Sequence, residues 1–287
     1  MSVAAKRSAR TRRDAIRAGA EILAGAGCET PRLDAEVLLA DALATSRERL
    51  LLDGALELDA RATRAFDSAL HRRAGAREPV AFITGRRAFR ALELAVDARA
   101  LIPRPETELL VEIGLTLPAG ASVLDVGTGC GAIALALKHE RPDLRVSAAE
   151  VDRGALALAR ENARALQIEV AFVHADLLAG VPDGFDAVLA NLPYVAEGER
   201  ETLAPEILEH EPPRALFAGP DGLSTIRALL EQASERARVG VIALEVGAGQ
   251  AEAVAELARA RGFADVETER DLAGIERAIV ARRRARG

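Results

Sequence analysis

Apolar residues in the first quarter of the chain recur at the three- and four-residue spacing of helices. One face of an early helix carries Ile16, Ala20, Ile22 and Leu23. Pro31 opens a second helix, because proline suits the first helical position, and a third helix is expected over residues 60–74. The sequence therefore predicts a small helical bundle over residues 1–75.

The pattern then changes. Residues 79–102 alternate between apolar and polar positions and contain Gly85 and two β-like runs, which predicts a β-hairpin. Pro103 and Pro105 fix their own φ and keep the residues before them extended, so a stiff segment leads into a helix that begins at Glu106. Taken alone, this proline segment could be a rigid linker.

From residue 120 onward, apolar runs that suit buried strands alternate with helical patterns. Strands are expected at 122–126, 144–149, 168–174, 185–190, 239–246, 264–270 and 275–282. Helices are expected at 131–140, 153–165, 222–237 and 250–261. This order predicts an α/β fold with a mostly parallel, seven-stranded sheet between two layers of helices. We therefore divide the chain into a helical domain (1–75), a β-hairpin linker (76–103) and an α/β domain (104–287).

Composition narrows the class of protein. Of the 287 residues, 49% are hydrophobic and 29% are charged, as in globular proteins, and the net charge of −6 does not favour a general nucleic-acid-binding surface. The two cysteines, Cys28 and Cys130, are too few for a disulfide framework, and the four histidines lack metal-ligand spacing. We found no signal-peptide pattern and no apolar run of transmembrane length, so we expect a cytoplasmic protein without metal or membrane association.

The run from Val123 to Gly131 reads as a strand, a glycine-rich turn and the start of a helix. Gly127, Gly129 and Gly131 are alternate residues, so the Gly-x-Gly-x-x-Gly spacing of dinucleotide-binding proteins is not met. Asp125 inside the strand is unexpected for pyrophosphate binding and suits a ligand with a cationic or amino-acid end. We therefore favour S-adenosyl-L-methionine over a nicotinamide cofactor, with a tight turn that binds no ligand as the remaining alternative.

Two further strand ends carry acids. Glu150 lies about 20 residues after the glycines, where a carboxylate can accept hydrogen bonds from ribose hydroxyls. Asp176 could meet an adenine amino group, and Leu177 beside it could pack on the adenine ring. The candidate cofactor-binding residues are Asp125, Gly127, Thr128, Gly129, Cys130, Gly131, Glu150, Asp176, Leu177 and Asn191.

The tetrapeptide Asn191-Leu192-Pro193-Tyr194 closes the apolar run 185–190. Pro193 cannot donate a hydrogen bond to a neighbouring strand, so the strand should end there and leave Asn191 at its tip, where open α/β sheets build their sites. The Asn191 side chain offers one acceptor and two donors in a plane, which can hold a planar amide or amino group. Tyr194 is the only tyrosine of the chain. The alternative is an ordinary polar turn.

These motifs together resemble class I S-adenosylmethionine-dependent methyltransferases, which have a Rossmann-like fold. More narrowly, the chain resembles the peptide chain release factor glutamine methyltransferases. The segments that carry the narrower resemblance are 33–39, 79–89, 101–108, 211–213, 219–223, 245–250 and 271–277. The chain departs from the family pattern at Leu192, where Asn-Pro-Pro-Tyr has proline, at Phe82, usually tyrosine, and at Arg90, usually aromatic.

The resemblance implies an enzyme that methylates the side-chain nitrogen of glutamine in the Gly-Gly-Gln motif of class 1 peptide chain release factors. S-adenosyl-L-methionine would be converted to S-adenosyl-L-homocysteine. The candidate catalytic and substrate-binding residues are Asn191, Leu192, Pro193 and Tyr194. The Asn191 side chain and the Leu192 carbonyl would hold the substrate amide, while Pro193 and Tyr194 would shape the slot. We expect the helical domain to contact the release factor and the chain to be a monomer.

Two other hypotheses for the function remain open. Asn-Leu-Pro-Tyr also occurs in rRNA adenine dimethyltransferases, so an N6-adenine methyltransferase acting on DNA or rRNA is the nearest rival. The net charge, the 3% aromatic content and the Pro-Arg-Pro-Glu-Thr-Glu segment argue against it, whereas Arg282-Arg283-Arg284 supports it. The second is a non-catalytic cofactor-binding protein, which only Leu192 supports.

Overall fold

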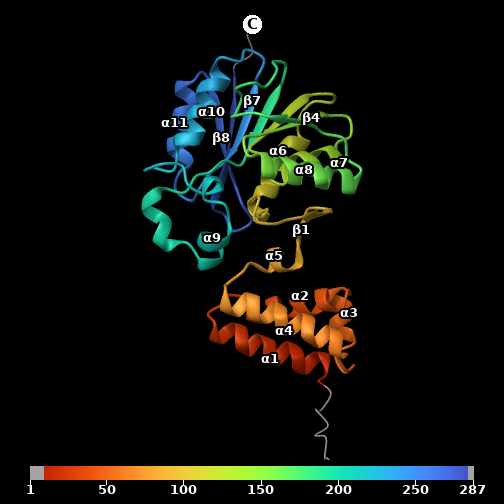
Figure 1. Ribbon diagram of the computed structural model, residues 1–287. Coiled ribbons are helices and arrows are strands. Elements are labelled where there is room, and N and C mark those ends of the chain that lie inside the picture. The colour runs from red at the N-terminus through yellow and green to blue at the C-terminus, as the bar shows by residue number, and fades with distance from the viewer. Residues whose placement is uncertain (1–9, 284–287) are drawn as a thin grey trace, which may run out of the picture. The chain divides into compact units, whose positions relative to one another are not determined.

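A computed structural model describes residues 10–283, and this part of the chain divides into two compact units (Figure 1). The first unit runs to Gly85 and includes Pro205–His210. The second comprises Arg86–Ala204 and continues from Glu211. A short segment from the middle of the chain is therefore part of the N-terminal unit.

The first unit is helical, as the spacing of apolar residues predicts. Its helices are α1 (Arg12–Gly25), α2 (Pro31–Ala42), α3 (Arg47–Leu52), α4 (Ala60–Gly75), α5 (Val80–Thr84) and α9 (Pro205–His210). Side-chain oxygens of Thr11, Ser46 and Asp59 accept a backbone N–H of the first turn of α1, α3 and α4, which stabilises each helix start. Phe66 of α4 is fully buried and lies against α1, where a Cβ added at Gly19 would come within 2.9 Å of its ring.

Ion pairs fix α9 to the rest of this unit. The Glu206 carboxylate lies 2.8 Å from Arg73 Nη1 and 2.6 Å from Arg77 Nη2. Arg73 also pairs with Asp34 at 2.8 Å, and both of these side chains are buried. His210 Nε2 lies 2.6 Å from the Ala76 carbonyl oxygen. Removing one partner would leave a buried charge unpaired, so truncating any of these side chains should strongly destabilise the unit.

Two local expectations for residues 1–102 need correction. Ile22 was expected on the buried face of the first helix, but it is 51% exposed, because a helix of 3.6 residues per turn cannot face both Ile22 and Leu23 fully inward. The predicted β-hairpin is confirmed, but it is shorter than residues 79–102: α5 precedes it, and Gly85, at φ +72°, ends that helix. The hairpin strands are β1 (Arg86–Phe89) and β2 (Leu92–Ala95).

The second unit contains the predicted mostly parallel sheet. Its strands are β3 (Ser122–Val126), β4 (Arg145–Glu150), β5 (Ala171–His174), β6 (Ala187–Ala190), β7 (Val241–Glu245), β8 (Asp265–Arg270) and β9 (Glu276–Arg282). Across the described residues their order is β5-β4-β3-β6-β7-β9-β8, with β9 antiparallel to both of its neighbours and the other pairs parallel.

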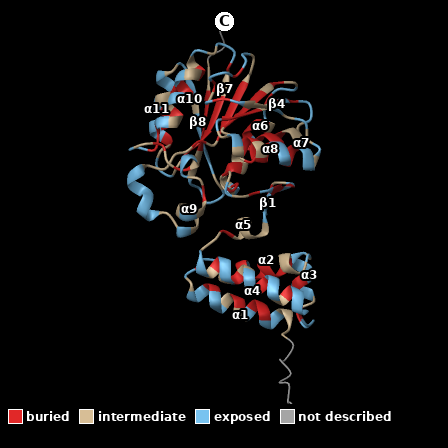
Figure 2. Cartoon of the chain, viewed as in Figure 1, coloured by how far each residue is buried: buried red, intermediate tan, exposed pale blue. Residues whose placement is uncertain are grey.

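Helices cover both faces of this sheet. One face carries α6 (Glu108–Leu115), α7 (Ala132–Glu140) and α8 (Arg153–Leu166), and the other carries α10 (Ser224–Ser234) and α11 (Ala251–Ala260) (Figure 1). Short 3-10 turns lie at η1 (Pro105–Thr107), η2 (Glu197–Thr202) and η3 (Pro213–Ala215). The central strands are buried between these layers (Figure 2), which explains their continuous apolar sequences.

The strand order reverses at β3, whose neighbours are β4 on one side and β6 on the other. The loops after β3 and β6 therefore diverge toward opposite faces and leave a crevice at the carboxyl ends of these strands. The glycine-rich turn follows β3, Glu150 is the last residue of β4 and Asn191 follows β6, so all three lie where strands end at this crevice.

Candidate active site

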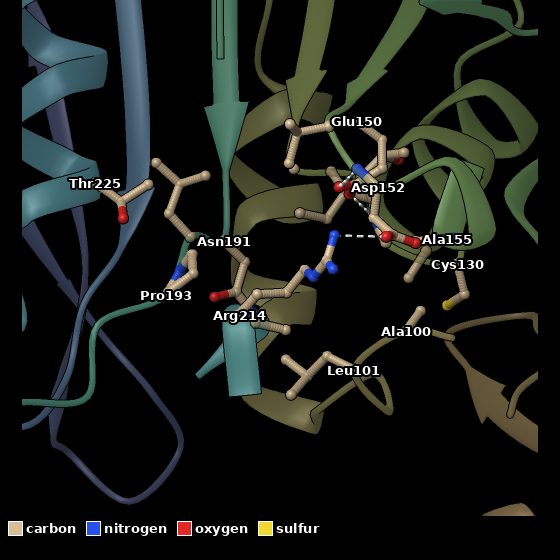
Figure 3. Close-up of a pocket in the computed structure, with 18 of the residues that line it drawn as sticks. Ala100, Leu101, Cys130, Glu150, Asp152, Ala155, Asn191, Pro193, Arg214 and Thr225 are labelled. Atoms are coloured by element: carbon tan, nitrogen blue, oxygen red, sulfur yellow. Dashed lines mark hydrogen bonds and ion pairs between the residues drawn. The ribbon is translucent and has the colours of Figure 1, made fainter. Parts of the chain in front are cut away.

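A cavity of about 300 Å³ lies at the carboxyl ends of β3, β4 and β6 (Figure 3). Of the residues singled out in the sequence, those that line it are Gly127, Thr128, Gly129, Cys130, Glu150, Asp176, Leu177, Asn191, Leu192 and Pro193. Asp125, Gly131 and Tyr194 do not line it. The fold thus brings most of the predicted site residues around one space.

The glycine loop is attached to the strand beside it. The backbone N–H groups of Gly127 and Thr128 donate to the Ala149 carbonyl at 2.9 and 3.1 Å. Gly127 has φ +72°, and a Cβ there would come within 3.0 Å of Leu192 Cδ2, so both the conformation and the packing require glycine. The loop backbone can therefore approach a ligand closely from β3.

Glu150 occupies the position expected of a ribose-binding carboxylate. It is 8% exposed, and its two oxygens accept the N–H groups of Gly129 and Asp152, each at 2.9 Å. These two donors hold the carboxylate at the edge of the cavity. Because each carboxylate oxygen can accept a second hydrogen bond, capacity remains for ligand hydroxyls.

Asp125 lies beneath the loop and not in the cavity. Its Oδ2 accepts the Thr128 hydroxyl at 2.5 Å and the Ala134 N–H at 3.1 Å, which ties the loop to the first turn of α7. Burial raises the Asp125 pKa to about 7, against the opposing effect of these hydrogen bonds. Its structural role here is to brace the loop from below.

Cys130 is a buried part of the same loop. Burial raises the pKa of its thiol to about 12, so the thiol is protonated at neutral pH. Its carbonyl accepts from Asn162 Nδ2 at 2.9 Å, and Asn162 also exchanges hydrogen bonds with the backbone of Ala95 in β2. The side chain of Asn162 therefore connects the β-hairpin to the glycine loop.

Asn191 follows β6 directly and points its amide at the proline-rich segment. Asn191 Nδ2 donates to Thr107 Oγ1 at 2.9 Å. Leu192, where the family pattern has proline, is 4% exposed and packs under Gly127. A buried side chain thus holds the loop at the position where a proline would fix the backbone.

The second half of the tetrapeptide is supported from behind. Gln250 Nε2 donates to the Tyr194 carbonyl at 2.8 Å, while Gln250 Oε1 accepts the Gly247 N–H at 2.9 Å. A Cβ at Gly222 would lie 2.2 Å from the Tyr194 carbonyl oxygen. Tyr194 packs against the core, and burial raises its pKa to about 12. Its neutral ring supports the loop from the side away from the cavity.

The cavity has further walls that the sequence alone did not assign as site residues. They are Arg99, Ala100, Leu101, Pro103, Thr107, Ile133, Asp152, Ala155, Ala175, Arg214 and Thr225, with Ala132, Val151 and Ala215. Arg214 of η3 reaches Asp152, with 2.6 Å between Nη1 and Oδ2, and Figure 3 shows it extending across the cavity. Among these residues, only Leu101, Pro103 and Thr107 lie in a family-like segment, 101–108, and a second such segment, 211–213, directly precedes Arg214.

Glu211 explains why those two segments act together. It is buried, forms an ion pair with Arg104 and accepts the Ile102 N–H at 3.3 Å. These two contacts join Glu211 to residues that precede it by 107 and 109 positions, beside one wall of the cavity. A pattern search along the chain cannot detect such a pairing.

In the part of the chain that the structure describes, no three His, Cys, Asp or Glu residues gather as a metal site, and no helix is long and apolar enough to cross a membrane. The described arginines of the basic C-terminal run interact with other residues of this chain. Arg282 pairs with Glu267 at 2.6 Å, and Arg283 lies over the Phe263 ring. Arg284 lies outside the described residues.

Two family models match the chain. The model described as the methyltransferase small domain matches residues 105–220, which contain the glycine loop, Glu150 and Asn191. The model described as the PrmC N-terminal domain matches residues 14–85, which span the helical unit up to Gly85.

A solved structure of similar fold supports the architecture. A methyltransferase from Pyrococcus furiosus has a TM-score of 0.54 at 18% sequence identity, covering 78% of this chain and 100% of that chain. Together with the strand order and the matching methyltransferase model, this likeness confirms the expected class I methyltransferase fold.

Two relatives match nearly the whole chain. A release factor glutamine methyltransferase from Rhodospirillum rubrum is 40% identical over 274 residues, covering 94% of this chain and 84% of the relative. A release factor glutamine methyltransferase from Cereibacter sphaeroides is 43% identical over 272 residues, covering 94% of this chain and 97% of the relative. At this identity and coverage, the chain belongs to the release factor glutamine methyltransferase family.

Proposed function

We propose that this protein transfers a methyl group from S-adenosyl-L-methionine to the side-chain amide nitrogen of the glutamine in the Gly-Gly-Gln motif of class 1 release factors. The observation that carries the proposal is the Asn191 amide, held by Thr107 at the carboxyl end of β6 and facing the same cavity as the glycine loop. Family membership supplies the substrate class.

The cavity suits the cofactor that the family implies. The glycine loop gives a backbone surface that no side chain blocks, and Glu150 keeps acceptor capacity for ribose hydroxyls. Asp176 and Leu177 line the same cavity and would meet the adenine. When bound, S-adenosylmethionine supplies a methyl group already activated by a sulfonium. These binding roles are part of the proposal.

The protein's contribution to the reaction is positioning and electrostatics. A neutral amide nitrogen is a poor nucleophile because its lone pair is delocalised into the carbonyl. Asn191 Oδ1 and the Leu192 carbonyl would each accept one N–H of the substrate amide and so orient its nitrogen. Both acceptors interact more strongly with the more positive, more pyramidal nitrogen of the transition state. The proton can leave to water after transfer, so no general base is required.

We assign the remaining parts of the chain in the same proposal. The helical unit would contact the release factor, and Pro193 with Tyr194 would shape the slot for the glutamine. Tyr194 would do so through the backbone that it anchors, because its ring is not part of the cavity wall. Since release factors act in translation, we place the reaction in the cytoplasm, with the enzyme as a monomer.

The test is methyl transfer from labelled S-adenosylmethionine to purified release factor. A release factor whose Gly-Gly-Gln glutamine is changed to alanine is the control, and an rRNA fragment is a second acceptor. We expect label in the release factor, none in the control and none in the RNA. Label that persists in the control, or that enters only the RNA, would overturn the proposal.

A further inference from the structure

Asn191 and two polar side chains behind it come from three separate elements. Thr107 ends η1, Asn191 follows β6, and Glu245 ends β7. Thr107 is 4% exposed and Glu245 is 2% exposed, whereas Asn191 is only half-buried and reaches the cavity. A buried hydroxyl and a buried carboxyl thus lie under a side chain that faces the substrate space.

The hydroxyl of Thr107 is the centre of this group. It accepts a hydrogen bond from Asn191 Nδ2 at 2.9 Å, so its own proton remains available for another acceptor. Glu245 ends β7 next to Asn191, because Leu244 pairs with Ala190 across β6 and β7. The hydroxyls of Thr107 and Tyr194 both lower the Glu245 pKa. Glu245 Oε2 is buried and has no hydrogen-bond partner among the described residues.

The direction of these hydrogen bonds decides which end of the Asn191 amide faces the cavity. An ionised carboxylate can only accept, so an ionised Glu245 would take the proton of Thr107 and leave the Thr107 oxygen as an acceptor. Asn191 must then present its NH₂ group to Thr107 and its Oδ1 to the cavity. The torsion that turns an asparagine amide is broad, so the side chain itself does not favour this orientation.

The opposite orientation would be unproductive. With the amide turned over, the NH₂ of Asn191 would face the N–H groups of the substrate amide, donor against donor. We propose that Thr107 and Glu245 are positioning residues that hold the Asn191 amide with its oxygen toward the substrate nitrogen. The substrate in this inference comes from the proposed function, whereas the orientation of the Asn191 amide does not depend on that function.

The charge of Glu245 gives the arrangement a pH dependence. Burial raises the Glu245 pKa to about 7, and Glu106 adds to the rise, while Thr107, Arg277 and Tyr194 act in the opposite direction. Above this pKa the carboxylate accepts from Thr107. Below it, the protonated carboxyl can donate to Thr107, whose proton is then free to turn toward Asn191. The preference of the Asn191 amide for the productive orientation should therefore weaken as the pH falls through about 7.

The first experiment compares Thr107→Val with Thr107→Ser. Valine keeps the shape of threonine but has no hydroxyl, whereas serine keeps the hydroxyl. We expect Thr107→Val to lower kcat for release factor methylation by roughly 10- to 100-fold, because the substrate nitrogen is no longer held in line. Thr107→Ser should stay close to wild type, and the Kd for S-adenosylhomocysteine should be unchanged in both. Equal kcat values for wild type and Thr107→Val would overturn the inference.

The second experiment does not depend on turnover. In ¹⁵N-labelled full-length protein with S-adenosylhomocysteine bound, the side-chain NH₂ signals of Asn191 are assigned by their loss in Asn191→Ala. We expect these signals to titrate with a midpoint near pH 7 in the wild type and to lose this titration in Glu245→Gln, which removes the charge but keeps the shape. A titration that persists in Glu245→Gln would contradict the inference.

The two experiments separate this inference from the proposed function. If wild-type protein methylates no release factor, the proposed function fails, yet the Asn191 titration still tests the orientation. If wild-type protein is active and the Thr107 and Glu245 variants behave like it, only the positioning inference fails. Thermal unfolding of each variant identifies any loss of fold, and Thr107→Ser and Glu245→Gln remain informative if Thr107→Val does not fold.

Discussion

The two sides of the cavity are held in different ways. On the side proposed to bind the cofactor, the Glu150 carboxylate accepts backbone N–H groups from residues 21 and 2 positions away, and the glycine loop bonds to the neighbouring strand. On the side proposed to be catalytic, Asn191 is held by Thr107, 84 positions away, and the Tyr194 carbonyl by Gln250, 56 positions away. One side is a local motif, whereas the other is assembled from distant parts of the chain.

This difference explains where the chain can depart from its family pattern. A loop fixed by its own backbone requires particular residues, because few residues adopt positive φ or leave space for a ligand. A loop fixed by its surroundings can change one residue if the packing adjusts. Leu192 stands where the family pattern has proline, and its buried side chain reaches the underside of the cofactor loop.

The largest expected effect is that of Asn191→Ala. Removing the group that we propose contacts the reacting nitrogen should lower kcat by roughly 100- to 1000-fold, a loss typical of a transition-state hydrogen bond. The Kd for S-adenosylmethionine, measured by calorimetry, should stay near the wild-type value. A folded variant that no longer bound cofactor would place Asn191 on the cofactor side of the comparison.

Gly222→Ala tests whether the catalytic side depends on distant support. A methyl group there would lie 2.2 Å from the Tyr194 carbonyl oxygen and 2.9 Å from Gln250 Nε2, so the tetrapeptide must shift. We expect kcat to fall roughly 100-fold, as for a displacement of about 1 Å at a reacting centre.

Gly274→Ala is the matched control for Gly222→Ala. Gly274 has φ +79°, close to the +71° of Gly222, but an added Cβ would meet no described heavy atom within 4 Å. The control should carry only the backbone strain of about 1–2 kcal/mol. Equal kcat values in the two variants would mean that contact with Tyr194 is unimportant.

Glu150→Ala is the reciprocal change on the cofactor side. It removes a charged acceptor for ribose hydroxyls, so the Kd for S-adenosylmethionine should rise about 10- to 100-fold. At saturating cofactor, kcat should change far less than in Asn191→Ala. Calorimetry that gave an unchanged Kd would show that the ribose lies elsewhere.

Leu192→Ala should have the smallest effect on turnover. It should nevertheless change both cofactor affinity and kcat, because the Leu192 side chain touches both sides of the cavity. The lost packing should reduce the free energy of unfolding by about 2–5 kcal/mol, and both cofactor affinity and kcat should decline a few-fold. Leu230→Ala, in the same core cluster but on α10 and outside the cavity wall, is the control. Urea unfolding should show similar losses in both, with cofactor affinity reduced only in Leu192→Ala.

The sequence was most informative where structure is local. The expected strands match β3 to β9 to within a few residues at each end. The central strands β3, β6 and β7 were easiest to predict, because buried parallel strands leave continuous apolar runs. Glu150 and Asn191 were placed at the cavity by their positions at strand ends. The side to which a residue turns after a strand was harder to predict: Asp125 lies beneath the loop and Tyr194 points to the core.

Long-range contacts explain what sequence reasoning missed. Thr107 looked like part of a stiff linker, and only the fold brings its hydroxyl to Asn191. Arg214 reaches the cavity from a short 3-10 turn that shows no periodic pattern. α3 is only six residues long, too short for helical spacing to identify it.

The place of α9 in the N-terminal unit has a consequence for how the chain is made. Arg77 and its partner Glu206 are 129 positions apart, so at ribosomal speeds of 5–20 residues per second roughly 6 to 26 seconds separate their synthesis. During that interval, Arg77 lacks the carboxylate that pairs with it in the finished protein, and Arg73 has only Asp34. The first unit to emerge is therefore completed only after the Asn191-Leu192-Pro193-Tyr194 tetrapeptide of the second unit has been translated.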